Sequence, residues 1–319
     1  MSLNSNTKAL KPVNKASSLY KFGRKMYRAR YLQLLILPGL VYFIIFQYGP
    51  MYGVLMAFQN YRPRLGVWGS PWVGFEQFIK FFNHPYFWRL IFNTLIINVY
   101  QIIFVFPIPI IFALLLNELR GKIFKRTVQT ISYLPHFISL PAIIGMLVMF
   151  LSPTDGIVNR IIESLGGTPY YFLADARWFR PLYILSDIWT TTGWSAIFYI
   201  AALSNVNQEL YEVAGLDGAS RVSMMWHISI PSIAPTIIIL FLLNVGKIMS
   251  LGYEKVLLMQ NPFIYETSEV ISTFVYRRGL EQAEYSFSTA VSVFNSVINI
   301  FILIIANSVS RKVSETSLW

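Results

Sequence analysis

Glu212-Val-Ala-Gly-Leu-Asp-Gly-Ala-Ser-Arg221 is the stretch that decides how this chain folds. It is polar and loop-like, lies between two very hydrophobic segments, and is followed by Ile228-Ser-Ile-Pro231. Residues 207–214 favour a short helix that Gly215 ends, because helices often finish with a left-handed residue. Asp217 can cap a second helix, which Pro231 stops. The stretch therefore predicts a helix, a turn and a helix between two hydrophobic segments.

The second of these helices has an apolar side. Ala219, Val222, Met225 and Trp226 fall three or four positions apart, which places them on one face. An exposed apolar face of this kind needs a partner. The ordinary alternative is a surface loop made of two capped helices.

The composition is that of a membrane protein. Of the 319 residues, 55% are hydrophobic, 16% aromatic and only 13% charged, and the mean hydropathy is +0.51. A soluble globular domain carries roughly 25% charged residues. The chain contains no cysteine, which excludes disulfide and thiol chemistry.

Six segments are long and apolar enough to span a bilayer, which takes about 20 mostly apolar residues. Several contain proline or glycine, which membrane helices tolerate because neighbouring helices satisfy the freed backbone groups. The sequence thus predicts an all-α polytopic membrane protein with six transmembrane helices and no second domain. The predicted spans cover approximately residues 31–58, 90–116, 127–151, 182–203, 233–258 and 287–309.

Basic residues set the predicted orientation. The net charge is +11, and a basic arm, residues 1–30, precedes the first span. Such a flank stays in the cytoplasm, so both termini and the segments 117–126 and 204–232 are expected inside. The inside segments carry 15 Lys and Arg, and the outer loops 59–89, 152–181 and 259–286 carry 9. We expect the arm to be polar and partly disordered, and residues 31–319 to form one transmembrane domain.

The loop at about 205–235 resembles the cytoplasmic EAA loop of ABC importer permeases of the maltose-transporter type. The family pattern is Glu-Ala-Ala, three residues, Gly, nine residues, Ile, one residue, Leu-Pro. This chain has Glu212, Ala214, Gly218, Ile228 and Pro231 at those places. It departs by Val213 for the first Ala and Ile230 for Leu. Segments 72–94 and 113–135 also resemble sugar permeases of this family, and the resemblance extends from about residue 31 to the C-terminus.

The resemblance implies a type I ABC importer transmembrane domain of MetI-like fold, and a MalF-like permease subunit in the bacterial inner membrane. It implies four kinds of partner: a second, MalG-like permease subunit, two ATPase subunits, an extracytoplasmic solute-binding protein and a carbohydrate cargo. No nucleic acid is expected. The residues that it assigns to the ATPase-coupling loop are Glu212, Ala214, Asp217, Gly218, Ala219, Arg221, Met225, Trp226 and Pro231.

No catalytic or cofactor site is expected in this chain. Neither Gly121-Lys122 nor Gly246-Lys247 stands in the nucleotide-binding frame GxxxxGK[ST]. ATP and Mg²⁺ are therefore expected in the partner ATPase subunits. His84, His136 and His227 are isolated and lack metal-ligand spacing, so no metal site is expected.

Polar residues inside the spans are costly and usually face a cavity or a partner helix. Sugars are bound through hydrogen bonds and aromatic faces, and the stretch Trp189-Thr-Thr-Thr-Gly-Trp194 offers both. Interfacial belts and helix–helix contacts are the ordinary alternative. The candidate pathway residues are Asn98, Gln101, Asp187, Trp189, Thr191, Trp194, Asn244, Lys247, Tyr253 and Asn295. Further polar residues in the spans are Asn93, Tyr100, Thr190, Thr192 and Asn299.

Lys247 is the most specific of these candidates. In the middle of the fifth span a lysine costs roughly 2.5–3.5 kcal/mol on insertion scales. It can serve as a counter-charge for an anionic sugar. It can equally form an ion pair with Asp187 or with a partner subunit, or reach water in a cavity.

Within the family, the chain most resembles permeases for complex oligosaccharides, including acidic ones from alginate or pectin. This resemblance rests on Tyr48-Gly-Pro-Met-Tyr-Gly53, on Phe58-Gln-Asn-Tyr61 and on Lys247. The alternatives are an ATP-independent secondary transporter or channel subunit, and an ABC permease for a non-sugar solute. A membrane-embedded enzyme lacks any catalytic constellation.

Overall fold

The protein is described by a computed structural model that covers residues 29–119 and 121–313. The chain divides into two compact units, Met1–Gly53 and Val54–Trp319. Within the described residues, β structure is confined to one isolated antiparallel bridge between Gln59 and Trp72. The prediction of an all-α protein is confirmed. The predicted basic arm lies, up to residue 28, outside the described residues.

The described part of the first unit is helical. It holds α2 (Arg30–Phe43), the π-helical turn η1 (Ile44–Tyr48) and the beginning of η2 (Gly49–Phe58). Together, Arg30–Phe58 forms a candidate membrane span of 29 residues. Its bounds agree with the first predicted span.

The second unit contains the remaining helices. In its first half these are α3 (Gly66–Gly69), α4 (Glu76–Phe82), α5 (Phe87–Tyr100), η3 (Gln101–Val105), α6 (Pro107–Glu118), α7 (Lys122–Tyr133), η4 (Leu134–Phe137), α8 (Leu140–Phe150), α9 (Ile157–Ser164), η5 (Phe172–Ala174) and α10 (Ala176–Leu203). In its second half they are α11 (Gln208–Leu216), α12 (Arg221–Met224), η6 (Met225–Ser229), α13 (Ile230–Val245), α14 (Tyr253–Met259), η7 (Pro262–Ile264), α15 (Tyr265–Ser268), α16 (Ile271–Tyr276), η8 (Arg277–Glu281) and α17 (Tyr285–Val313).

Four described helices are long and apolar enough to cross a membrane: Arg30–Phe58, Phe87–Glu118, Arg221–Val245 and Tyr285–Lys312. A fifth span arises if Lys122–Phe137 and Leu140–Phe150 are taken together. The predicted fourth span corresponds to α10, which has 28 residues. It carries Arg177, Arg180 and Asp187 and does not belong to this apolar set. Each predicted span thus has a helical counterpart, but the third and the fifth differ from the prediction.

The predicted third span, 127–151, is bent by 99° instead of forming one continuous helix. Ile138 and Ser139 are extended, with ψ angles of 134° and 144°. Pro141 follows in the first turn of α8, where its missing N–H leaves no helical hydrogen bond unmade. Proline favours a new helix start at this point, and the chain turns before it.

The predicted fifth span, 233–258, has the wrong bounds. The helix begins at Arg221 and ends at Val245, and residues 246–252 are not helical. Asn299 of α17 holds this break: its Oδ1 accepts from the N–H of Met249 at 2.9 Å, and its Nδ2 donates to Ser250 Oγ at 2.7 Å. Lys247 therefore lies in the break and not in the middle of a helix.

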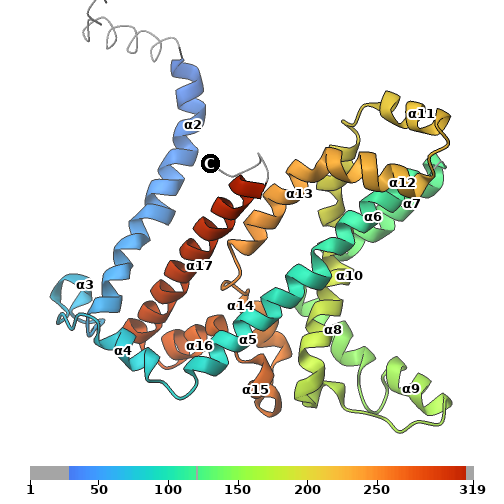
Figure 1. Ribbon diagram of the computed structural model, residues 1–319. Coiled ribbons are helices and arrows are strands. Elements are labelled where there is room, and N and C mark those ends of the chain that lie inside the picture. Colours follow the sequence, from blue (N-terminus) through green and yellow to red (C-terminus); the bar gives the residue numbers. More distant parts are fainter. Residues whose placement is uncertain (1–28, 120, 314–319) are drawn as a thin grey trace, which may run out of the picture. The chain divides into compact units, whose positions relative to one another are not determined.

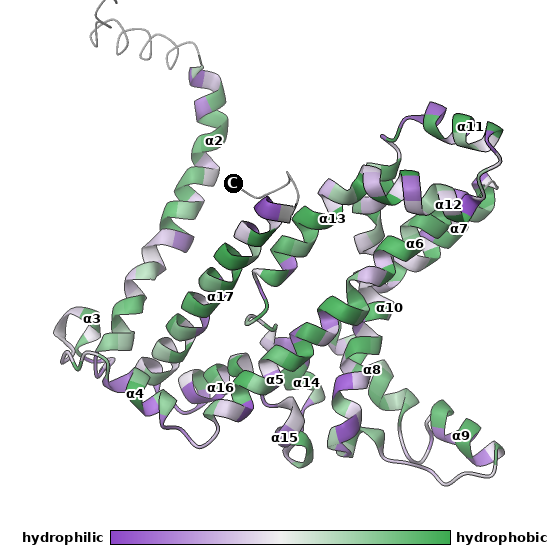
Figure 2. Ribbon diagram, viewed as in Figure 1, coloured by the Kyte–Doolittle hydropathy of each residue, from purple (hydrophilic) through white to green (hydrophobic). Residues whose placement is uncertain are grey.

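Figure 1 shows that the loops of the second unit gather at two ends. α11, α12 and the start of α7 lie at one end of α10, and α9 and α15 lie at the other. In Figure 2, hydrophobic residues dominate α6, α8, α13 and α17, whereas hydrophilic residues mark α11 and α12. The predicted inside segments 117–126 and 204–232 thus lie at one end of the unit, and the predicted outer loops 152–181 and 259–286 lie at the other.

α10 is the central helix of the second unit and packs against α6, α7, α13 and α15. Its approach to α7 depends on Gly193, because a Cβ atom there would lie 2.1 Å from the backbone oxygen of Ser132. The two helices thus touch through their backbones.

Gly193→Ala should force α7 and α10 apart. We expect it to lower the free energy of unfolding by about 1–3 kcal/mol, the usual cost of overpacking. The matched control is Gly145→Ala in α8, where a Cβ atom would meet nothing within 4 Å. Denaturant titration of the purified protein in detergent measures both changes. Equal stability of the two variants would contradict the close packing at Gly193.

Candidate functional site

The loop between α10 and α13 has the predicted helix–turn–helix form, with different turn residues. Asn207 caps α11, since its Oδ1 accepts from the N–H of Glu209 at 3.0 Å. Gly215 lies inside α11, and the left-handed residue is Gly218, with a φ angle of +76°. The prediction that Gly215 ends the helix is therefore wrong. Its neighbours allow the helix to continue by one residue, and the turn uses the next glycine.

Two further details of the predicted loop are corrected. Ser220, and not Asp217, caps the second helix, because its Oγ accepts from the N–H of Ser223 at 3.2 Å. Asp217 instead ends α11. Pro231 does not stop the helix: it lies in the first turn of α13, and one helix runs from Arg221 to Val245. The π-helical turn η6 immediately precedes α13, and the missing N–H of the proline is accommodated there.

The loop is firmly attached on one side and open on the other. The Tyr211 and Ser229 hydroxyls are hydrogen-bonded at 2.8 Å, which ties α11 to η6. Met225 packs against the hydrophobic cluster that contains Leu203 and Ile233. Ala214 and Ala219 are partly buried, whereas Asp217, Gly218, Arg221 and Pro231 are exposed.

The open side of the loop combines apolar residues with one carboxylate. Leu216 is 88% exposed, Trp226 64% and Val222 58%. Glu212 is also exposed, four positions before Leu216 on α11 and hence on the same face of that helix. Large apolar side chains concentrated on one surface mark an interaction site. The arrangement can therefore receive a partner through apolar contacts and one acidic group.

Six of the candidate pathway residues come together on a second surface. Two cavities, of about 380 and 180 Å³, share Gln101 and Asn244 in their linings. We call their combined surface the polar groove. Its elements are α5, η3, α6, α10, α13 and the break after α13. Its predicted members are Asn98, Gln101, Asp187, Thr191, Asn244 and Lys247.

An ion pair controls the charge of the polar groove. Asp187 Oδ1 lies 2.5 Å from Nζ of Lys255, and its Oδ2 accepts from Gln101 Nε2 at 2.8 Å. Lys255 Nζ also donates to the backbone oxygen of Tyr183 at 2.9 Å. The side chains of Asp187 and Lys255 are 15% and 10% exposed. Lys255, and not Lys247, is thus the partner of Asp187.

Lys247 is exposed at the groove. Among the described residues, the ion pairs involve Arg89, Arg160, Lys255, Arg277 and Arg278, and none involves Lys247. Since Asp187 is already paired, the groove carries one uncompensated positive charge. It can therefore accept an anionic group.

The other candidates lie away from the groove. Trp194 stacks on His136 at a ring distance of 4.6 Å, and Trp189 lines a separate cavity beside α7. The hydroxyls of Thr190 and Thr192 donate to backbone oxygens of their own helix at 2.9 and 2.6 Å. Thr191 does the same at 2.7 Å, although it lines the groove. The Trp189–Trp194 stretch thus does not form one sugar-binding cluster.

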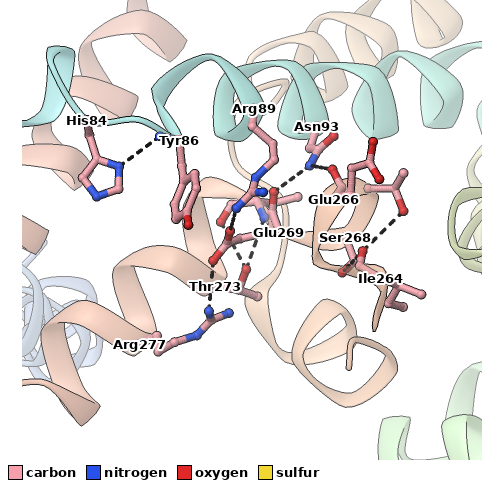
Figure 3. A network of polar contacts seen from close by, with 12 residues as sticks. His84, Tyr86, Arg89, Asn93, Ile264, Glu266, Ser268, Glu269, Thr273 and Arg277 are labelled. Atoms are coloured by element: carbon pink, nitrogen blue, oxygen red, sulfur yellow. Dashed lines mark hydrogen bonds and ion pairs between the residues drawn. The ribbon is translucent and has the colours of Figure 1, made fainter. Parts of the chain in front are cut away.

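Asn93 and Glu269 belong to a network of polar contacts that is separate from the polar groove (Figure 3). Glu269 is paired with Arg89 at 2.7 Å and with Arg277 at 3.0 Å, and its side chain is only 4% exposed. Asn93 Nδ2 donates to the backbone oxygen of Glu269 at 3.0 Å, and Arg180 Nη2 donates to Asn93 Oδ1 at 2.8 Å. The network joins α5, α10 and the segment from α15 to η8.

His84 borders this network. Burial lowers the pKa of His84 below its usual value, and the positive charge of Arg278, 3.4 Å away, acts in the same direction. The histidine ring also packs against Phe274 and Phe287. The lowered pKa favours the neutral form of the ring, which is part of the packing.

Glu269→Gln should strongly destabilise the second unit, because it leaves Arg89 and Arg277 without their carboxylate. Breaking a buried ion pair costs about 3–5 kcal/mol of unfolding free energy. The control is Asp155→Asn, in a well-exposed pair with Arg160 at 3.8 Å, which should leave stability unchanged. Denaturant titration compares the two. A Glu269→Gln protein as stable as this control would show that the network contributes nothing.

Sequence reasoning did not select Lys255 or Glu269. Both carry a readable signal, since a charge in or beside an apolar segment requires a partner. Their partners lie 68 and 180 positions away, at Asp187 and Arg89. Partners that lie so far apart in the chain cannot be identified from a single sequence.

Long apolar helices and an exposed loop with apolar residues at one end are features of a polytopic membrane protein that binds a partner. The chain belongs to the family of binding-protein-dependent transport system inner membrane components, whose pattern matches residues 105–315. The predicted ABC permease class is thereby confirmed, and the ATP-independent alternative is not favoured.

Individual relatives agree with this family. Protein LplB of Bacillus subtilis (strain 168) is 44% identical over 308 residues, 97% of each chain. The polygalacturonan/rhamnogalacturonan transport system permease protein YteP of the same strain is 43% identical over 295 residues, 92% of each chain. A chain in the crystal structure of a bacterial alginate ABC transporter, in complex with an alginate pentasaccharide-bound periplasmic protein, superposes with a TM-score of 0.85. It is 41% identical, and the match covers 92% of this chain and 99% of that one.

Proposed function

We propose that this chain is one of the two membrane-spanning subunits of an ABC importer that carries an acidic oligosaccharide into a bacterial cell. Its partners are a MalG-like permease, two ATPase subunits that bind ATP and Mg²⁺, and an extracytoplasmic solute-binding protein. Both termini and the α11–α12 loop face the cytoplasm. Two similar proteins support the cargo class, because one is named for polygalacturonan and another transports the acidic polysaccharide alginate.

The observation that carries the cargo proposal is the charge of the polar groove. Lys247 is exposed there without an acidic partner among the described residues, and Lys255 neutralises Asp187. A carboxylate of the cargo would meet one net positive charge. Asn98, Gln101 and Asn244 add amide groups for sugar hydroxyls. An uncharged sugar would gain less from this arrangement.

The loop is proposed to couple the permease to the ATPases. Glu212 supplies the polar docking contact, and Leu216, Val222 and Trp226 supply the apolar one. The helix that starts at Arg221 runs without interruption to Val245, next to Asn244 and Lys247 of the groove. At 1.5 Å per residue this helix spans about 37 Å. It can thus transmit a displacement of the loop to the groove as a rigid body.

Co-purification tests the proposed assembly. We expect a tagged form of this chain, extracted in mild detergent, to retain an ATPase subunit and a second permease. Recovery of this chain alone, under conditions that preserve its fold, would favour a transporter that works without ATP. The assay needs no knowledge of the cargo.

A further inference from the structure

The short helix α9 (Ile157–Ser164) carries a row of exposed aliphatic side chains. Ile157 is 58% exposed, Ile161 53% and Leu165 82%. They follow one another four positions apart, and the N–H of Leu165 still donates to the backbone oxygen of Ile161 at 3.2 Å, so they form one line along the helix. We call them the α9 stripe. Their side chains carry no hydrogen-bonding group, and apolar surface gathered in one place marks a site of interaction.

The rotation of α9 about its own axis is fixed by a buried asparagine. Asn159 is only 1% exposed. Its Nδ2 donates to the backbone oxygen of Tyr170 at 3.0 Å, and its Oδ1 accepts from the N–H of Tyr170 at 2.8 Å. On the inner side of α9, Val158 and Ile162 pack against the hydrophobic core. The α9 stripe therefore cannot turn inward without breaking these contacts.

The same asparagine holds α9 at the end of a membrane-spanning segment. Asn159 Nδ2 also donates to the backbone oxygens of Leu151 and Ser152, at 3.3 and 2.9 Å. These two residues directly follow α8, the second half of the bent candidate span, and Figure 1 shows α9 beside the end of α8. Met149 and Phe150, in the last turn of α8, are 67% and 49% exposed. The α9 stripe thus continues the apolar surface of this span at the level where the span ends.

The rest of the α9 surface is polar. Arg160 and Glu163, three positions apart, share another face of the helix and are exposed, and Figure 2 shows both hydrophobic and hydrophilic residues on α9. Tyr170 and Tyr171, in the segment that Asn159 holds, are 42% and 56% exposed. Amphipathic helices with a basic residue on the polar face, and tyrosines with a polar tip, are typical of the membrane–water boundary.

A soluble partner fits the α9 stripe less well than the bilayer does. A solute-binding protein would leave the permease between docking events, and the three aliphatic side chains would return to water each time. The bilayer covers them continuously, so the gain from removing apolar surface from water is permanent. The depth set by Asn159 and the lack of polar groups in the stripe both favour lipid.

We propose that α9 is an interfacial anchor that lies along the bilayer surface, with the α9 stripe among the lipid acyl chains and with Arg160 and Glu163 toward water. The apolar face of such a helix is buried about 5–10 Å into the boundary between headgroups and acyl chains. The anchor fixes the depth at which the connection from α8 to α10 lies in the membrane. Neither the cargo nor the ATPase enters this inference, so it goes beyond the proposed function and can fail independently of it.

Quenching of a fluorescent label tests the position of α9. Because the chain contains no cysteine, Ile161→Cys introduces one attachment site on the stripe, and Glu163→Cys provides a matched site on the polar face of the same helix. Each variant is labelled with bimane, together with the subunits that co-purify with it, and reconstituted into phosphatidylcholine vesicles. The unchanged chain gives the background from the other subunits. One quencher is phosphatidylcholine with a nitroxide near the start of its acyl chain, and the other is iodide on both sides of the membrane.

We expect the nitroxide lipid to quench the label of Ile161→Cys at least about twofold more strongly than that of Glu163→Cys, and iodide to show the reverse order. Equal quenching of both labels by iodide, with none by the lipid, would overturn the anchor. A label on Ile161→Cys that neither quencher reaches would assign the stripe to a contact with another subunit. Iodide quenching that disappears when the solute-binding protein is added would assign it to that protein.

Leu165→Cys keeps the test decisive if Ile161→Cys does not fold. Leu165 is the most exposed member of the stripe, so the label there disturbs the fewest internal contacts. It should show the same preference for the lipid quencher. Failure of both variants to fold would also overturn the anchor, because it would show that the stripe is packed against protein.

Discussion

Glu212→Lys abolishes transport and the coupling of ATP hydrolysis to it, while the subunit stays in the membrane and stays folded. Glu212 is exposed on α11, so the substitution disturbs no internal contact. It reverses the charge at the surface that we propose meets the ATPase. Reversal of one charge at an interface costs several kcal/mol when like charges are brought together. We therefore expect transport to fall by at least about a hundredfold.

The control for this charge reversal is Glu163→Lys. Glu163 is also exposed, on α9 at the other end of the unit. It should transport like wild type. Transport is measured as uptake of labelled oligosaccharide into proteoliposomes, and membrane insertion is checked by recovery of the complex. Wild-type transport by Glu212→Lys would remove the loop from the coupling mechanism.

Gly218→Val provides a second approach to the same loop. Gly218 has a φ angle of +76°, which a β-branched residue rarely adopts. The turn between α11 and α12 would have to change its shape. Gly166→Val is a matched control, since Gly166 has a φ angle of +85° and likewise meets nothing within 4 Å. Both variants carry the same backbone strain, and only Gly218→Val should abolish transport.

Lys247→Met lowers transport of acidic oligosaccharides about tenfold or more, with a much smaller effect on neutral ones. A hydrogen bond to a charged group contributes about 1.5–3 kcal/mol, and methionine keeps the length of the side chain without its charge. Lys247 is exposed outside the helices, so little stability should be lost. The measurement is uptake of a polygalacturonan fragment against uptake of a neutral oligosaccharide of equal length.

Lys122→Met controls for the loss of one positive charge from the chain. Lys122 is exposed at the start of α7 and lines neither cavity of the polar groove. It should transport both sugars like wild type. An equal effect of Lys247→Met on transport of acidic and neutral oligosaccharides would show that Lys247 does not bind the carboxylate of the cargo.

Much of the fold can be predicted from the sequence because the bilayer imposes length and apolarity on its helices. The first, second and sixth spans are found close to their predicted bounds. The predictions of the third and fifth spans are wrong where a proline is compatible with two different backbone structures. Pro141 starts a new helix after a bend, whereas Pro231 sits in the first turn of α13 while the helix continues from Arg221. A proline thus predicts where a helix can change. The packing around it determines whether a new helix starts after a bend or the existing helix continues.

The candidate site was likewise predictable from the sequence only in part. The loop around Glu212 is readable because all of its determinants lie within a few positions of one another. The polar groove can be predicted only in part. The sequence shows that Asp187 and Lys247 are polar residues in apolar segments, but it does not show which residues they contact. The pairing of Asp187 with Lys255 depends on how α14 folds back after the break at residues 246–252. That break is in turn held by Asn299, some fifty positions further along.

The most direct measurement is the ATPase activity of the reconstituted complex with its solute-binding protein, tested with a range of sugars. The account predicts that acidic oligosaccharides stimulate ATP hydrolysis, that neutral ones do so weakly, and that Glu212→Lys removes the stimulation. Stimulation by a non-sugar solute, or stimulation by acidic sugars that Glu212→Lys leaves intact, would contradict it.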